Sequence, residues 1–136
     1  MSNTICYISN ASEYLVEKDI NELFDKVTAF NNSRGIKGIL LYSSGNFFQI
    51  LEGNKETIND LFYNRIKLDP RHSNIFVVIE KQYPSSVFNE YSSKFNTVKN
   101  SADLKKIISY LENNKYNSTH EKLKRLLGPF LFSMED

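Results

Sequence analysis

The start of the chain has the pattern of a strand, and the period of its apolar residues then changes to that of a helix. In the strand-like segment TICYISN, a period of two places Ile5, Tyr7 and Ser9 on one face and Cys6 and Ile8 on the other. From Val16 to Phe30 the apolar residues recur at helical spacing, and Gly35 follows as a stop signal. The pattern therefore predicts a strand followed by a helix of about five turns.

The next segment has the pattern of a hairpin followed by a second helix. The runs IKGILLY and FFQILEG are joined by SSGN, a short turn that contains glycine. Asn54 is placed to cap a helix whose apolar residues keep a helical period from Ile58 to Ile66. Pro70 lacks a backbone N–H, so the helix is expected to end there.

The remaining segments predict two further strands and two terminal helices. NIFVVIE is a β-branched run, and a weaker alternation surrounds Tyr91, Ser93 and Phe95. Apolar stripes predict short helices over 102–113 and 118–127.

The predicted order βαββαββ indicates an α+β, ferredoxin-like sheet with two helices on one face. Because FFQIL and IFVVI are apolar on both faces, the two C-terminal helices are expected to cover the opposite face. The predicted organisation is a domain over residues 1–98 and a helical extension over 99–136, packed on the same domain.

Several polar side chains lie on faces that should point inward. Asn31 ends the apolar stripe of the first helix, and Arg65 and Asp69 continue that of the second, four residues apart and able to pair. Gln49 and Tyr7 each share a strand face with apolar neighbours. A buried polar group without a partner costs about 1–3 kcal/mol, so the set predicts a shared network or a bound polar ligand.

Each of these residues also has an ordinary structural interpretation. Asn31 can be a helix-end residue, Arg65 and Asp69 a surface pair, and Gln49 an edge-strand residue that faces water. Their convergence favours one slot between the helices, suited to a flat ring with heteroatoms at its edge.

Composition narrows the function. The chain has 136 residues, 40% hydrophobic and 24% charged, as expected for a single globular domain. A net charge of +1 gives no field for nucleic acid or an anionic membrane, and the N-terminus lacks a signal-peptide pattern. The single cysteine, Cys6, cannot form an internal disulfide and fits a reducing cytoplasm.

Motifs for catalysis are not found in the sequence. It contains no Walker loop, no Gly-x-Gly-x-x-Gly, no His-x-x-x-His and no Gly-x-Ser-x-Gly motif. His72 follows the second helix and His120 lies in a capping segment, positions typical of hydrogen-bonding or solvated histidines. We therefore expect a protein that is not an enzyme.

Three segments together resemble the BLUF family, whose members sense blue light with bound FAD. They are CYIS with Tyr7, NNSRGIKGILLYSSGNFFQILEG, and RIKLDPRH. The resemblance spans about residues 4–97, and its most specific part is the hairpin from Gly35 to Gly53. It implies the ferredoxin-like fold with FAD held between the two helices.

The resemblance also implies residue functions. Tyr7 would be the photochemical electron donor and Gln49 the amide that switches between this phenol and the flavin. Asn31 would bond the pyrimidine edge of the ring and Phe30 would pack on the ring. The remaining implied residues, near the far helix end and the ring oxygens, are Arg65, Asp69, Arg71 and His72.

The sequence departs from the family at the fifth strand. Members usually have Trp-Ser-Met where this chain has Tyr91, Ser92 and Ser93. The way in which the flavin state is reported is therefore expected to differ, and Ser93 is predicted to touch the switch and to affect the lifetime of the lit state.

The prediction is a cytoplasmic blue-light photoreceptor of the short, stand-alone type. After Thr97 nothing resembles a cyclase, a phosphodiesterase or a DNA-binding module, so we expect it to act on an unidentified signalling protein or through its own oligomer. The alternative is a ferredoxin-like interaction domain that has lost flavin binding or photochemistry. The colour of the protein separates the two.

Overall fold

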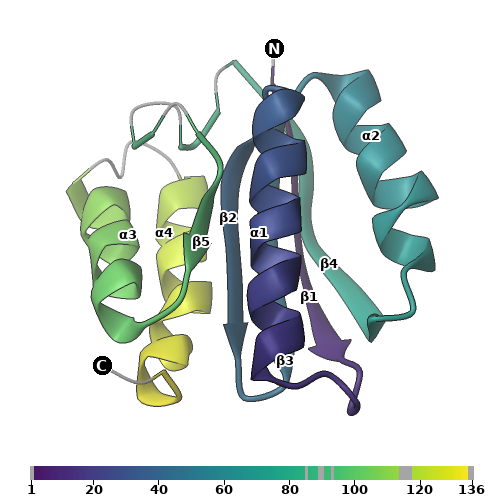
Figure 1. The fold of residues 1–136 in the computed structure, drawn as a ribbon. Coiled ribbons are helices and arrows are strands. Elements are labelled where there is room, and N and C mark those ends of the chain that lie inside the picture. The colour runs from purple at the N-terminus through teal and green to yellow at the C-terminus, as the bar shows by residue number, and fades with distance from the viewer. Residues whose placement is uncertain (1, 85, 89–90, 93, 114–117, 135–136) are drawn as a thin grey trace. The chain divides into compact units, whose positions relative to one another are not determined.

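The computed structural model describes residues 2–84, 86–88, 91–92, 94–113 and 118–134 (Figure 1). The chain divides into two compact units, residues 1–97 and residues 98–136. The first unit carries the first four strands and both helices of the slot.

Within the described part of the chain, the sheet has five strands in the order β4-β1-β3-β2-β5. Antiparallel ladders join β1 to both β3 and β4, and β2 to β3, so β1 and β3 are central. The predicted α+β, ferredoxin-like arrangement is confirmed. The strands are β1 (Ser2–Ala11), β2 (Lys37–Ser43), β3 (Asn46–Gly53), β4 (His72–Tyr83) and β5 (Asn96–Val98).

The two helices of the first unit lie on one face of this sheet (Figure 1). They are α1 (Glu17–Ser33) and α2 (Lys55–Asn64). The side chain of Asn54 caps α2 by accepting from the backbone N–H groups of Glu56 and Thr57, at 2.9 and 3.4 Å. Helices and strands share one core, which contains Ile5, Tyr7, Leu40 and Leu51 from the strands, Ile20 and Phe24 from α1, and Ile58, Leu61 and Phe62 from α2.

Two glycines allow the hairpin to form. The turn between β2 and β3 has positive φ at Ser44 (49°) and Gly45 (80°), the geometry of a two-residue hairpin turn. Gly38 has φ 129°, and a Cβ there would lie 1.9 Å from the carbonyl oxygen of Ile50. Glycine at position 38 therefore lets β2 approach the backbone of β3 next to Gln49.

Helix α2 ends earlier than the sequence predicts. It stops at Asn64, and a 3-10 turn, η1 (Ile66–Leu68), follows before Pro70. Because the turn changes the period, the expected pairing of Arg65 with Asp69 is not the one that forms. Asp69 instead bonds the guanidinium of Arg71, with three N–O distances of 2.5–3.0 Å.

The fifth strand begins later than predicted, at Asn96. The backbone N–H groups of Tyr91 and Ser92 donate to the carbonyl of Phe88, at 3.1 and 3.3 Å. The N–H of Lys94 donates to the hydroxyl of Ser92 at 3.1 Å. Backbone donors used in this way are not available to a strand ladder, and Ser93 lies outside the described residues.

The second unit contains the two predicted terminal helices and a short 3-10 helix. These are α3 (Ser101–Asn113), α4 (Ser118–Leu127) and η2 (Gly128–Phe132). Helices α3 and α4 pack together, with Leu104, Ile107 and Leu111 buried on one and Leu123 and Leu127 on the other. That these helices cover the second face of the sheet, with a boundary at residue 98, stays a prediction. Among the described residues, none of the helices combines the length and apolar character that crossing a bilayer needs.

Candidate functional site

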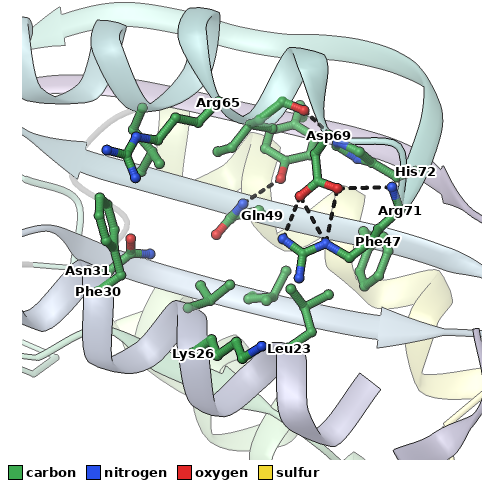
Figure 2. Close-up of a pocket in the computed structure, with 15 residues that line it drawn as sticks. Leu23, Lys26, Phe30, Asn31, Phe47, Gln49, Arg65, Asp69, Arg71 and His72 are labelled. Carbon is green, nitrogen blue, oxygen red and sulfur yellow. Dashed lines mark hydrogen bonds and ion pairs between the residues drawn. The ribbon is translucent and has the colours of Figure 1, made fainter. Parts of the chain in front are cut away.

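A pocket of about 240 Å³ opens between α1, α2 and the sheet of the first unit (Figure 2). This volume is below the about 300–1,000 Å³ typical of sites for drug-sized ligands, so it suits one ring system. The residues that line it are Tyr7, Leu23, Lys26, Val27, Phe30, Asn31, Leu40, Phe47, Gln49, Leu61, Arg65, Ile66, Asp69, Arg71 and His72.

Tyr7 and Gln49 form the floor of the pocket. They are register partners on the central strands β1 and β3, and their side chains are 3% and 4% exposed. The Nε2 group of Gln49 donates a hydrogen bond to the hydroxyl of Tyr7 (Figure 2). This hydrogen bond thus gives a partner to only one end of the Gln49 amide, the Nε2 end.

Burial controls the protonation of Tyr7. Desolvation raises the pKa of its hydroxyl well above the usual value near 10, and the carboxylate of Asp69 raises it further. The hydrogen bond from Gln49 opposes these effects without cancelling them. The phenol is therefore neutral at physiological pH.

Two buried polar atoms that face this pocket lack a partner among the described residues. They are Nδ2 of Asn31, whose side chain lies at the end of α1, and Oε1 of Gln49. Leaving such groups unpaired costs about 1–3 kcal/mol each. One is a donor and the other an acceptor, so the pocket fits a ligand whose edge carries both kinds of group. A flavin ring has such an edge.

Phe30 and Arg65 lie at one rim of the pocket, and Arg34 contacts Phe30 from outside the lining. The guanidinium carbons of Arg34 and Arg65 lie 4.8 and 4.9 Å from the centroid of the Phe30 ring. Such cation–π contacts hold the arginines over the ring and fix its plane. Phe30 comes from α1 and Arg65 follows α2, so this contact links the two helices across the pocket (Figure 2).

The opposite rim is formed by Asp69 and Arg71. Partial burial would raise the pKa of the Asp69 carboxyl, but hydrogen bonds from Arg71 outweigh it and the net pKa is below the usual value. The pair therefore presents an ionised carboxylate and a guanidinium beside the pocket.

His72 has both ring nitrogens occupied by protein groups. Nε2 lies 2.7 Å from the carbonyl oxygen of Ile66, and Nδ1 lies 2.7 Å from the hydroxyl of Ser9. Because a carbonyl only accepts, Nε2 donates this bond. The imidazole therefore borders the pocket as an oriented ring, 6.0 Å from the Tyr7 ring and 6.3 Å from the Phe47 ring.

All the residues predicted for the site line this one pocket: Tyr7, Phe30, Asn31, Gln49, Arg65, Asp69, Arg71 and His72. Their functions stay predictions. Cys6 is fully buried and is not a lining residue. Tyr91 packs edge-on against Phe88, with centroids 6.0 Å apart, and does not line the pocket either.

The sequence analysis missed part of the lining. Lys26 is one helical turn before Phe30, and this spacing could have identified it as a neighbour on the same face. The other residues that were not predicted as site residues are apolar and had been interpreted only as core or not at all: Leu23, Val27, Leu40, Phe47, Leu61 and Ile66. Such positions carry no sequence signal that separates a cofactor wall from ordinary core.

The fold and the pocket together define a class: a ferredoxin-like domain that holds a flat, heteroatom-edged ring between two helices. The family model BLUF, described as sensors of blue-light using FAD, matches residues 3–94. The chain belongs to the BLUF family, and its cofactor is a flavin.

Curated relatives and solved structures agree with this assignment. The chain is 37% identical over 87 residues to photoactivated adenylate cyclase subunit beta of Euglena gracilis, a match that covers 60% of this chain and 10% of that protein. It is 32% identical over 90 residues to the blue light- and temperature-regulated antirepressor BluF of Escherichia coli K12, covering 66% of this chain and 22% of the relative. The chain thus spans only a small part of these relatives.

A solved structure described as the photo-activated state of BlsA is similar to this chain, and the match covers 100% of this chain and 99% of the chain in that structure. Its TM-score is 0.69 at 26% sequence identity.

Proposed function

We propose that this chain senses blue light through a hydrogen-bond switch formed by Tyr7 and Gln49 beside a noncovalently bound FAD. The observation that carries the proposal is the geometry of Gln49, which bonds Tyr7 with one end of its amide and presents the other, unpartnered end to the pocket. The bound flavin supplies absorption of blue light and accepts an electron.

Tyr7 is the proposed electron donor. Its phenol is buried, neutral and hydrogen-bonded to Gln49, so it could give an electron and then its hydroxyl proton to the bound flavin from a group that carries no charge beforehand. The carboxylate of Asp69 lies close enough to raise the pKa of Tyr7, and the same field favours positive charge that develops on the ring.

Gln49 is the proposed switch because its amide has two different ends. In the structure Nε2 donates to Tyr7 and Oε1 is the unpartnered end. Rotating the amide by half a turn would let Oε1 accept from the Tyr7 hydroxyl and aim two N–H donors at the pocket. The two states would offer a bound flavin an acceptor or donors from the same amide, without any change in net charge.

Asn31 is the proposed anchor of the ring. Its side chain is 2% exposed and its Nδ2 lacks a partner, so it can donate to a carbonyl oxygen of the pyrimidine edge. Phe30 would pack on the ring, while Arg65, Asp69, Arg71 and His72 would border its other end. The pocket has room for one ring system, so the remainder of FAD would extend beyond it.

The attachment is proposed to be noncovalent. Cys6 is buried on the strand face opposite to Tyr7 and offers no attachment point at the pocket. Denaturation should therefore release intact FAD.

We further propose that this chain is not itself an enzyme and signals through a partner protein or its own oligomer in the cytoplasm. The cyclase and antirepressor relatives support signalling through an attached or bound effector. The single cysteine supports a reducing compartment. The net charge of +1 supports a partner other than nucleic acid or a membrane.

A light-minus-dark absorption spectrum with a flavin assay tests the proposal. The purified protein should be yellow, and illumination should shift the flavin absorption slightly to longer wavelength, with recovery in darkness. A colourless protein that takes up no FAD on refolding with excess cofactor would instead support the alternative, an interaction domain that has lost flavin binding.

A further inference from the structure

The segment from Ser86 to Phe95 directly precedes β5, and the structure describes residues 86–88, 91–92 and 94–95 of it. Within its described part, Ser86 bonds Ser2 through their hydroxyls at 3.0 Å. The backbone N–H groups of Val87, Phe88 and Phe95 all donate to side chains from other elements. The segment is therefore held near both ends by side-chain acceptors.

Glu52 holds the first end. Its carboxylate accepts from the N–H of Val87 at 2.7 Å, from the N–H of Phe88 at 3.0 Å and from the hydroxyl of Thr4 at 2.7 Å. The Glu52 side chain is fully buried. Burial raises the pKa of this carboxyl, and the three donors and Lys37 oppose that rise.

Glu52 is also close to the proposed switch along the chain. It lies three residues after Gln49 in β3, so the two side chains point to opposite faces of the central strand. Gln49 faces the flavin pocket, and Glu52 faces the segment on the other side. A change in the backbone of β3 at Gln49 therefore reaches Glu52 without crossing another element.

Asn32 holds the second end. Its Oδ1 accepts from the backbone N–H of Phe95 at 2.8 Å, across 63 residues of sequence. Asn32 is exposed and follows Asn31 directly at the end of α1. The ring of Phe95 is 2% exposed and belongs to the same core cluster as Tyr7.

We infer that Glu52 and Asn32 are positioning residues that tie the Ser86–Phe95 segment to the two elements carrying Gln49 and Asn31, so that light changes the backbone of the segment at both ends. The inference rests on the proposed function. Both anchors accept from backbone N–H groups, so this tie does not depend on which side chains the segment carries.

Amide hydrogen exchange in the dark and under blue light tests this inference on the full chain with FAD bound. In the wild type, illumination should change the exchange rates at Val87, Phe88 and Phe95. In Glu52→Gln an NH₂ group replaces an accepting oxygen, so at least one N–H loses its acceptor and the dark exchange of Val87 or Phe88 should become about tenfold faster. The light-dependent difference should then be lost at the amide that exchanges faster and kept at Phe95.

Asn32→Ala should show the reverse pattern, with the difference lost at Phe95 and kept at Val87 and Phe88. Asn32 is exposed, so this variant decides the question even if Glu52→Gln fails to fold. Matched controls are Glu22→Gln and Asn21→Ala, both exposed on α1, which should keep all three differences. Both anchor variants should keep the reversible absorption shift.

The outcomes separate the inference from the proposed function. A wild type without any absorption shift would refute the proposed function, and the inference would fall with it. A normal shift with no light-dependent change at the three amides, or with differences of the same size in the anchor variants, would overturn the inference alone and leave Glu52 and Asn32 as purely structural residues.

Discussion

At the residue scale, the Tyr7–Gln49 hydrogen bond can be removed from either side without opening a large cavity. Tyr7→Phe deletes one hydroxyl, and Gln49→Leu replaces an amide by an apolar group of similar volume. Both variants should bind FAD and remain yellow, yet both should lose the light-induced absorption shift. Light-minus-dark spectra with flavin content check this.

Matched controls exist on the same sheet. Tyr42→Phe alters a tyrosine of β2 that packs on Phe47, and Gln82→Leu alters an exposed glutamine of β4; neither lines the pocket. Both should keep the shift. A normal reversible shift in Gln49→Leu would disprove the switch even if the protein binds FAD.

Asn31→Ala should act on binding and leave the switch intact. It removes a donor that the ring would use, so the affinity for flavin should fall about tenfold or more, equivalent to about 1–3 kcal/mol. The same change removes a buried amide nitrogen that has no partner among the described residues, so the flavin-free protein should be no less stable. Titration with flavin and thermal unfolding of the flavin-free protein measure the two effects, with Asn21→Ala as the control. An unchanged affinity for flavin would show that Asn31 does not bind the ring.

At the element scale, Gly38 determines how closely β2 and β3 pair beside Gln49. A Cβ at this position meets the carbonyl oxygen of Ile50 at 1.9 Å, and φ is 129°, so Gly38→Ala should destabilise the protein by about 3 kcal/mol or more. Gly45→Ala is the matched comparison, because its φ of 80° is strained while its surroundings are open, and about 1 kcal/mol is expected. Denaturant unfolding of both variants measures the difference. Equal destabilisation would show that the contact with Ile50 contributes nothing.

The sequence predicts elements well where the signals are local. The hairpin turn at Ser44 and Gly45, the cap at Asn54 and the stop at Gly35 each depend on residues within a few positions, and all appear in the structure. Likewise, helical and strand periods alone pointed Asn31 and Gln49 inward, because the core imposes these periods.

The sequence fails where distant contacts decide. β5 starts after Phe95, whose N–H bonds Asn32 across 63 residues, and no local pattern encodes this partner. The predicted pairing of Asp69 with Arg65 was also wrong. A 3-10 turn interrupts the helical period, and Asp69 pairs with Arg71. The positions of Glu52 and Asn32 beside the Ser86–Phe95 segment became visible only in three dimensions.

At the scale of the whole molecule, Asp69 should contribute to the pH dependence of stability. Its folded-state pKa is below the unfolded value of about 3.9, so its contribution is present above that pH and is lost as the pH falls through the folded-state pKa. Glu52 has the opposite sign, because burial raises its pKa. Below about pH 4, the free energy of unfolding should therefore fall more steeply in the wild type than in Asp69→Asn. Urea unfolding between pH 3 and pH 7 measures this, and parallel curves would contradict it.

The position of the Tyr7–Gln49 pair on the two central strands has a consequence for folding. The two residues are 42 positions apart, so they meet only after the chain has closed a long loop and paired β1 with β3. A slip of one residue in this pairing would turn Gln49 to the other face of the sheet and separate it from Tyr7. A refolding chain should therefore recover its response to light only when the central strands have reached the correct register. The time course of that recovery, followed by absorption, would measure how fast β1 and β3 pair correctly.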